Sequence, residues 1–303
     1  MSVGAVVVGD ALIDELRDDS GIREFVGGAG LNVAVGLSRL GVPTTLIAMV
    51  GDDEAGARIR SYLADYDVGL IETASPLGSS RAVSTRSGGG EPTYEFNDAA
   101  WNRRVDFGEA ERAAMAAADI VVVSCFPFDD ADQTADLIAA AAGSRLAIDP
   151  NPRTGMLHDR EAFRSGFERA AAAASLVKVG EDDATLLYRE SLDLLRTRLI
   201  DLGVDAVLAT YGAGGAAIDS GADAVTRPIS DLPGRIVDTM GAGDAAFAAT
   251  IAAVLDGDPA SADEWSAVLE RAMDAAAATC RFEGALLRLP SAVQGMDLDR
   301  LGT

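Results

Sequence analysis

The chain of 303 residues has very little lysine, histidine or cysteine: Lys178 is its only lysine, His158 its only histidine, and Cys125 and Cys280 its two cysteines. A Walker A loop needs a lysine between a glycine-rich turn and Ser or Thr. Lys178 instead lies in an apolar run, so this nucleotide-binding loop is excluded. One histidine and two distant cysteines also exclude a zinc site of His and Cys ligands. We interpret the cysteines as buried, reduced thiols and His158 as part of a surface loop.

Basic residues are also scarce relative to acidic ones, since 25 Lys and Arg stand against 48 Asp and Glu, a formal net charge of −23. This charge repels nucleic acid and anionic membrane, so neither is expected as a partner. An acidic surface poor in lysine is typical of adaptation to high salt, where counter-ions screen the self-repulsion. No apolar run reaches transmembrane length, and residues 2–8 lack the basic region of a signal peptide. We therefore expect a first strand at this end and a cytoplasmic protein.

Strand and helix patterns alternate along most of the chain. Residues 4–9 and 44–50 are continuous apolar runs, typical of parallel strands covered on both faces, and helical patterns follow at residues 31–40 and 54–66. The alternation predicts an α/β fold with a doubly wound, mostly parallel sheet, in which ligands bind beyond the carboxyl ends of the strands. Further strands and helices are predicted at residues 119–123, 130–142, 145–148, 160–174, 176–179 and 206–210.

Two segments depart from this alternation. Residues 13–26 are predicted to form a strand pair that leaves the main sheet, and residues 81–85 and 92–96 alternate around a glycine-rich turn in the manner of a β-hairpin. Together they predict a small second sheet, which must rest on a ligand, the main domain or another subunit because it buries little apolar surface alone. A surface hairpin without a role in binding is the alternative. We assign the small sheet to residues 13–26 and 71–99, and the α/β domain to residues 1–12, 27–70 and 100–303.

The strongest local signal is the segment Val-Asp-Thr-Met-Gly-Ala-Gly-Asp-Ala-Ala-Phe at residues 237–247, which an Ala-rich helical pattern follows. Gly241, Ala242 and Gly243 are predicted to form the first turn of a buried helix. The free N–H groups and the dipole of such a turn create an anion site that glycine leaves open to phosphate. Asp244 lies in the same turn, and a carboxylate beside bound phosphate suits a general base that deprotonates the attacking alcohol. A plain helix cap is the alternative.

The stretch Asp-Thr-x-Gly-Ala-Gly-Asp within this segment is similar to the second signature of the ribokinase-like (PfkB) sugar kinases, and five other segments resemble further motifs of that family in the same order. These are residues 9–14, 27–34, 51–56, 149–153 and 210–215. The resemblance implies the family fold, with the small sheet as a lid, and ATP-dependent phosphoryl transfer to a hydroxymethyl group of a sugar. It also implies Mg²⁺, a monovalent cation such as K⁺, and a homodimer formed through the lid.

The same resemblance implies roles for single residues. On the sugar side it gives Asp14, Gly28, Asn32, Arg153 and Asp244, with Asn151 in reach of sugar or phosphate oxygens. On the nucleotide side it gives Thr210, Gly212, Gly215, Gly241 and Gly243, with an adenine pocket near residues 275–280. Lys178 is either a phosphate contact or an ordinary charge at a strand end. The family commonly carries Asn-x-x-Glu where this chain has Gly180-Glu-Asp-Asp183, so Asp183 is the candidate for organising Mg²⁺ through water.

The motif variants in this chain are most similar to the fructokinase branch, so fructose is the first predicted substrate. The 2-keto-3-deoxygluconate kinase branch shares several of them, and a lid arginine such as Arg81 or Arg86 would suit its carboxylated sugar. Tyr94, Phe96 and Trp101 either contact the sugar or pack the lid. A ribokinase, a nucleoside kinase with a larger apolar lid pocket, and a catalytically silent sugar-binding regulator are further alternatives. The regulator would be expected to lose the base at the Asp244 position, which this chain keeps.

Overall fold

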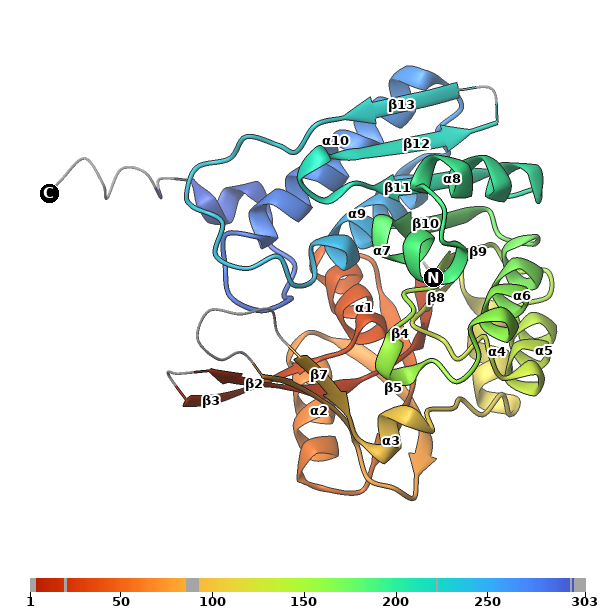
Figure 1. Ribbon diagram of the computed structural model, residues 1–303, viewed down its shortest axis with the longest axis vertical. Helices are drawn as coiled ribbons and strands as arrows, with labels where there is room; N and C mark the ends of the chain where they lie inside the picture. Colours follow the sequence, from red (N-terminus) through yellow and green to blue (C-terminus); the bar gives the residue numbers. More distant parts are fainter. Residues whose placement is uncertain (1–3, 19–20, 86–92, 222, 295, 297–303) are drawn as a thin grey trace, which may run out of the picture.

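The computed structural model describes residues 4–18, 21–85, 93–221, 223–294 and 296. Its larger sheet has nine strands (Figure 1). In spatial order they are β13 (Asp223–Arg227), β12 (Ala216–Ser220), β11 (Ala206–Thr210), β10 (Leu176–Gly180), β9 (Leu146–Asp149), β8 (Ile120–Ser124), β1 (Ala5–Gly9), β4 (Thr44–Gly51) and β5 (Val68–Ser75). From β11 to β5 all neighbours are parallel, and β12 and β13 add an antiparallel edge. The predicted doubly wound, mostly parallel sheet is therefore confirmed.

Helices cover both faces of this sheet, which explains the continuous apolar runs of its central strands: every residue of β1 and β8 is buried. One face carries α1 (Ala29–Arg39), α2 (Glu54–Asp65), α9 (Ala242–Asp256) and α10 (Ala262–Thr279) (Figure 1). The other face carries α4 (Glu109–Ala117), α5 (Ala131–Ala140), α6 (Arg160–Ala171) and α8 (Leu192–Asp201). Within the residues that the structure describes, no helix is long and apolar enough to cross a bilayer.

Short helical segments join these elements. They are α3 (Asp98–Trp101), η1 (Thr154–Met156), α7 (Glu181–Asp183), the π-helical turn η2 (Ala184–Tyr188), η3 (Gly212–Gly214) and η4 (Pro290–Val293). Three of them, η1, α7 and η3, follow the carboxyl ends of β9, β10 and β11, where a doubly wound sheet binds its ligands.

The smaller sheet has four strands, in the order β3 (Gly21–Gly27), β2 (Leu12–Asp18), β6 (Ser80–Thr85) and β7 (Thr93–Phe96). It contains both the predicted strand pair and the predicted hairpin, whose glycine-rich turn falls outside the described residues. β5 pairs with β4 in the large sheet as far as Ser75, so a boundary at residue 71 would cut this strand. We therefore move the boundary of the proposed lid to Ser75, and the division of the chain into a body and a lid remains a proposal.

Candidate active site

Several predicted residues meet at one edge of the large sheet because parallel strands present their carboxyl ends together. β10, β9, β8 and β1 are consecutive in the sheet, and the helices α1 and α9 begin at the same edge. The first turns of these two helices are joined by a hydrogen bond from Asn32 Nδ2 of α1 to Asp244 Oδ2 of α9, at 2.8 Å. Two of the predicted residues, 212 positions apart in the sequence, are thus in direct contact.

Asp244 lies in the first turn of α9 and is buried, with 9% of its surface exposed. Burial raises the pKa of this carboxyl, while the hydrogen bond from Asn32 and the charges of Lys178 and Arg153 oppose the rise. A carboxylate whose pKa is raised accepts a proton more readily than an ordinary aspartate does. Its position and its basicity both suit the removal of a proton from a bound alcohol.

Gly241 precedes α9 in the left-handed region, with φ of 73°. A Cβ there would lie 2.5 Å from Cβ of Ala285 and 2.6 Å from its Cα, so only glycine fits against this neighbouring segment. In the described part of the chain the amides of Gly243 and Asp244 have no hydrogen-bond acceptor, whereas Ala242 donates to the carbonyl of Thr239 at 3.3 Å. The first turn therefore offers free donors to an anion, although Ala242 is partly engaged.

Asp14 and Gly28 lie where the small sheet joins α1, since Asp14 is on β2 and Gly28 stands between β3 and α1. Asp14 is half-buried on β2, and its Oδ2 lies so close to Gly27 that a Cβ at that residue would be only 2.2 Å away. Burial raises the pKa of Asp14 to about 7; the charge of Asp10 adds to the rise and that of Arg153 opposes it. Gly28 has φ of 106°, and a Cβ there would meet the carbonyl oxygen of Asp10 at 2.8 Å, so this position requires glycine.

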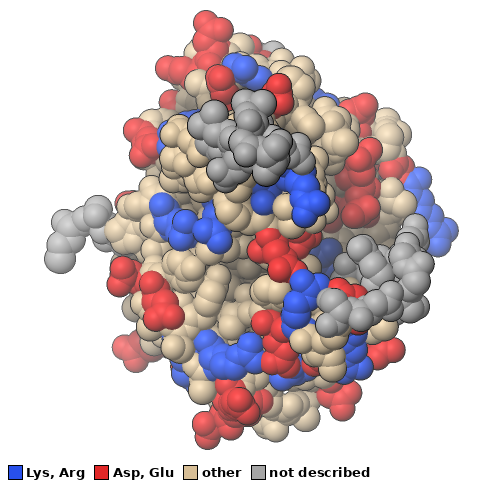
Figure 2. Space-filling model, turned by 90° about the vertical axis from the view of Figure 1, so that its left-hand side faces the viewer, with Lys and Arg blue, Asp and Glu red and all other residues tan. Residues whose placement is uncertain are grey.

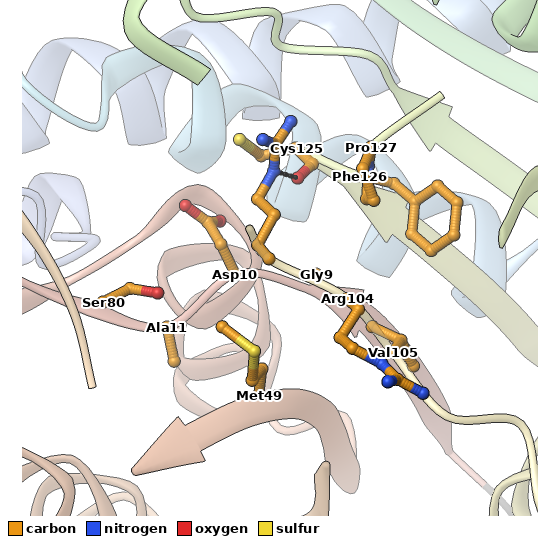
Figure 3. Close-up of a pocket in the computed structure, with 11 residues that line it drawn as sticks. Gly9, Asp10, Ala11, Met49, Ser80, Arg104, Val105, Cys125, Phe126 and Pro127 are labelled. Atoms are coloured by element: carbon orange, nitrogen blue, oxygen red, sulfur yellow. Dashed lines mark hydrogen bonds between the residues drawn. The ribbon is translucent and has the colours of Figure 1, made fainter. Parts of the chain in front are cut away.

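Asp10 is a site residue that the sequence analysis missed. It is buried with 9% exposed, directly follows β1, and accepts a hydrogen bond from the Gly30 amide at 3.0 Å. Figure 3 shows its carboxylate turned toward the end of β8 at Cys125. Burial raises the pKa of Asp10, and the Gly30 amide and the charges of Arg103 and Arg153 oppose the rise. The sequence did contain a signal for Asp10, because it belongs to the same motif, residues 9–14, as Asp14.

Cys125 and Asn151, which follow β8 and β9, have unusual backbone conformations. Both have positive φ, 56° and 38°, which is rare for residues other than glycine and is typical of strained functional loops. Arg103 is buried and fastens this region, since it donates to the carbonyls of Cys125 at 3.3 Å and Met156 at 2.8 Å. These bonds fix the loops that follow β8 and β9.

A small cavity of about 20 Å³ lies under these loops, enough for one water molecule (Figure 3). Its lining mixes apolar and charged residues: Gly9, Asp10, Ala11, Met49, Ser80, Arg103, Arg104, Val105, Cys125, Phe126 and Pro127.

Arg153 is exposed and forms no ion pair in the described part of the chain. Its charge nevertheless acts on Asp10, Asp14 and Asp244, because it lowers the pKa of all three carboxyls. The structure thus groups Arg153 with the predicted substrate residues. A guanidinium group that is not committed to a protein carboxylate remains free for oxygen atoms of a ligand.

The predicted nucleotide residues extend along the neighbouring strand ends. Thr210 ends β11 opposite Gly180 of β10, and a Cβ at Gly180 would lie 3.2 Å from Thr210 Oγ1. Gly212 and Gly215 follow with φ of 51° and 93°. At Gly215 a Cβ would collide with the carbonyl oxygen of Arg227 at 2.1 Å, so this glycine is required by the close turn itself.

Asp183 is buried and caps its own turn, because its Oδ2 accepts the Gly180 amide at 2.6 Å. Burial raises its pKa to about 6, with Lys178 opposing. Within the described residues, no group of three His, Cys, Asp or Glu side chains could hold a metal ion. The chain therefore fits a divalent cation only if phosphate and water supply most of its ligands, with Asp183 acting through water.

Three of the side chains that were candidates for contact with the sugar have other partners. Arg81 is paired with Glu15, at 3.2 Å, and with Glu24. Phe96 packs on Gly155. Trp101 is 39% exposed and lies against His158, with 4.1 Å between the ring centroids and 49° between the ring planes. His158 is exposed as predicted, and Cys280 is only half-buried, where a buried thiol was predicted. Arg86 and the side chain of Tyr94 are not among the described parts of the structure.

Charged side chains of both signs are interspersed on the face of the molecule that Figure 2 shows. The excess of acidic residues in the sequence is thus spread out there instead of forming one acidic patch.

Comparison with known proteins gives a consistent result. The family described as pfkB family carbohydrate kinase matches residues 2–292. The fructokinase of Rhizobium leguminosarum bv. trifolii is 29% identical over 260 residues, which cover 81% of this chain and 78% of that protein. The structure of a fructokinase from Xylella fastidiosa with bound ATP has a TM-score of 0.83 at 21% identity, covering 99% of this chain and 100% of that one. A fructokinase double mutant from Vibrio cholerae O395, with fructose, ADP and potassium ion bound, has a TM-score of 0.79 at 21% identity over 94% of both chains.

Proposed function

The chain belongs to the pfkB family of carbohydrate kinases, and we propose that it transfers the γ-phosphoryl group of ATP to a hydroxymethyl group of fructose. The observation that carries this proposal is the buried Asp244 carboxylate, held by Asn32 in a helix turn that has free amides. One turn thereby combines a proton acceptor with donors for phosphate, which are the two groups that phosphoryl transfer to an alcohol requires.

In the proposed reaction the sugar lies against Asp14, Gly28, Asn32 and Arg153. Asp244 takes the proton of the hydroxymethyl group as its oxygen forms a bond to the γ-phosphorus. The bond between that phosphorus and the bridging oxygen of ADP breaks, and ADP leaves with the electron pair. The amides of the turn that begins α9 stabilise the charge on the transferred group. The products are fructose 6-phosphate and ADP.

We further propose that ATP lies along Thr210, Gly212 and Gly215, with its adenine near the end of α10. The segment before α9 runs along this helix end, since the Val237 amide donates to the carbonyl of Cys280 at 2.8 Å and the Val237 side chain is exposed. Mg²⁺, bound through the phosphates and water, would offset the charge of the transferring group. Potassium is a second proposed cation, in line with the potassium-bound Vibrio protein. A cytoplasmic location and a homodimer through the small sheet are part of the same proposal.

A neutral sugar is favoured over 2-keto-3-deoxygluconate by the charges that line the site. The charges of Asp10 and Asp244 add to the burial that raises the pKa of Asp14, and the charge of Asp10 also raises the pKa of Asp244, so the sugar side is rich in carboxylates. Arg81, the described lid arginine that would suit a carboxylated sugar, is paired with Glu15 and Glu24. A substrate carboxylate would therefore be repelled by these acids. Arg153 would offset this repulsion only in part, because its charge already acts on all three carboxyls, whereas hydroxyl groups of a neutral sugar can donate to them.

We expect fructose to give the fastest ADP production from Mg-ATP in a panel that also contains 2-keto-3-deoxygluconate, ribose and adenosine. The assay should be run in molar KCl as well as in dilute buffer, because a chain of charge −23 is destabilised by self-repulsion when salt is low. Faster turnover of 2-keto-3-deoxygluconate would leave the chemistry intact and overturn the substrate. Absence of turnover on every sugar by the folded protein would favour a silent sugar-binding regulator.

Sugar affinity is expected to rise with pH around neutrality. Asp14 can accept two hydroxyl groups only when it is ionised, and its pKa of about 7 leaves it largely protonated at pH 6. Between pH 6 and pH 8 the dissociation constant for fructose, measured without ATP, should therefore fall about tenfold. In Asp14→Asn the affinity should be weaker and nearly independent of pH. A slope that persists in Asp14→Asn would assign the titration to another group.

The raised pKa of Asp14 also makes the stability of the folded protein fall as the pH rises, whereas the affinity for sugar increases. The folded-state pKa of Asp14 lies above its ordinary value of 3.8, so its stabilising contribution is complete below that value and is lost as the pH rises through about 7. The free protein should accordingly lose stability across the range in which it gains affinity for sugar.

A further inference from the structure

The only lysine of the chain is buried in the site and is held by an acid. Lys178 points from β10 with 7% of its surface exposed, and its Nζ lies 3.0 Å from Oδ2 of Asp149, which is completely buried at the end of β9. A lone buried charge would be costly, so each member of this pair needs the other. The pair joins two adjacent parallel strands at the edge where the site lies.

The ammonium group lies against the turn that offers amides to phosphate. A Cβ at Gly243 would be 3.3 Å from Lys178 Nζ and 3.5 Å from its Cε, so the lysine packs directly on the backbone of this glycine. The absence of a side chain at Gly243 leaves the ammonium group and the neighbouring free amides on the same small surface. A phosphoryl group bound to those amides would be within reach of Nζ.

The surrounding acids keep this lysine charged. Burial lowers the pKa of Lys178, but Asp149, Asp183 and Asp244 together outweigh it and raise the pKa to about 12. Asp183 is additionally engaged with the Gly180 amide and Asp244 with Asn32. Asp149 is different, because neither of its carboxylate oxygens has a hydrogen-bond partner among the described residues, and the ion pair with Lys178 is the one that it makes there.

We propose that Asp149 is a positioning residue for Lys178, and that it holds the ammonium group over Gly243 to contact the phosphoryl group during transfer. A lysine side chain has four rotatable bonds. Without the ion pair to Asp149, the ammonium group of Lys178 would therefore sample other positions in the site. The inference rests on the proposed function and adds to it a residue with no direct contact to either substrate. Asp149 and Lys178 should therefore act as one unit, with a larger effect on kcat than on the KM for ATP or sugar.

A double-mutant cycle tests this coupling. Lys178→Met should lower kcat by about 10²–10³-fold, as expected for the loss of one charged donor to the transition state. Asp149→Asn should lower it by up to about 10²-fold through misplacement of the ammonium group. In the Lys178→Met background, Asp149→Asn should have almost no further effect. An equal loss in both backgrounds would overturn the proposal, because Asp149 would then act independently of the lysine.

Asp219→Asn provides a matched control for the removal of a paired carboxylate. Asp219 lies on β12 of the same sheet and is bound by Arg196 Nε at 2.6 Å, away from the turn of α9. Its substitution should leave kcat near the wild-type value. A loss of kcat as large as that of Asp149→Asn would show that disturbing any ion pair of the sheet is sufficient.

A second measurement does not require turnover. Because Lys178 is unique, protein labelled with ¹³C-lysine gives a single ε-methylene signal in an NMR spectrum. We expect ATP, added without sugar, to shift this signal in the wild type and to shift it less in Asp149→Asn. The signal should also stay constant up to about pH 10 in the wild type and begin to titrate in the variant. An unmoved signal with bound ATP would refute the phosphate contact, whereas absent turnover with a shifted signal would refute only the proposed sugar chemistry.

Discussion

Replacement of Asp244 by asparagine is expected to lower kcat by about 10²–10⁴-fold, the range typical for loss of a general base. Asparagine has the same shape and can still accept the hydrogen bond of Asn32, so the contact between α1 and α9 should persist. It cannot take the proton of the sugar hydroxyl, however. The dissociation constants for sugar and ATP should change far less than kcat, and steady-state kinetics together with binding titrations would separate the two effects.

Stability gives a second readout for this variant. Since burial raises the pKa of Asp244, the ionised carboxylate is unfavourable in the folded chain, and asparagine removes that cost. The Tm near pH 8 should therefore be unchanged or higher. Asp256→Asn at the far end of α9 is the control, because Asp256 is exposed and paired with Arg271. Near-normal turnover by Asp244→Asn would rule out Asp244 as the base.

Replacement of Gly241 by alanine should have the second-largest effect, of about 10²–10³-fold in kcat. The methyl group would overlap Ala285, and alanine would also have to adopt φ of 73°. Ala285 contributes its Cα and carbonyl oxygen to this contact, so a side-chain rotation cannot relieve the overlap. The turn must then move, and its amides move away from the phosphoryl group. We also expect a loss of stability of about 1–3 kcal/mol.

Gly257→Ala offers a matched control at the other end of the same helix. Gly257 has φ of −173°, which any residue adopts, and a Cβ there meets no atom within 4 Å. Its substitution should leave kcat unchanged and stability almost unchanged. If Gly241→Ala were as active as Gly257→Ala, the turn before α9 would not be the phosphate site.

Much of this architecture could be predicted from residue patterns. The family, predicted from six motifs, is confirmed over residues 2–292, and the start of α9 lies one residue from its predicted place. Glycines that the backbone requires, such as Gly28 and Gly241, are visible in a sequence because no other residue type can replace them. Predicted helix ends were less accurate: α5 and α6 stop at Ala140 and Ala171 because alanine is equally acceptable in the turns that follow.

Other features depend on side-chain orientation, which a pattern does not contain. Asp10 and Asp149 were part of recognised motifs, yet nothing in their spacing shows that one accepts the Gly30 amide and the other binds Lys178. The sequence also could not show whether the Arg81 guanidinium is free to bind a substrate, because its acidic partners lie on two other strands of the small sheet. These contacts join elements that are separate in the sequence, so they depend on how the elements pack together.

Few groups of this protein change their protonation near neutral pH, because lysine and histidine are scarce, and some of those that do lie at the site, where pKa values are raised. Between pH 6 and pH 9 ordinary carboxylates and arginines do not change charge, and burial raises the pKa of both thiols, which leaves the single histidine and the α-amino group as background. Asp14, with a pKa of about 7, and Asp183, with a pKa of about 6, titrate at or next to this window. Calorimetric titrations with sugar or ATP in buffers of different ionisation enthalpy should therefore count the protons exchanged by the site itself, almost without background from the surface.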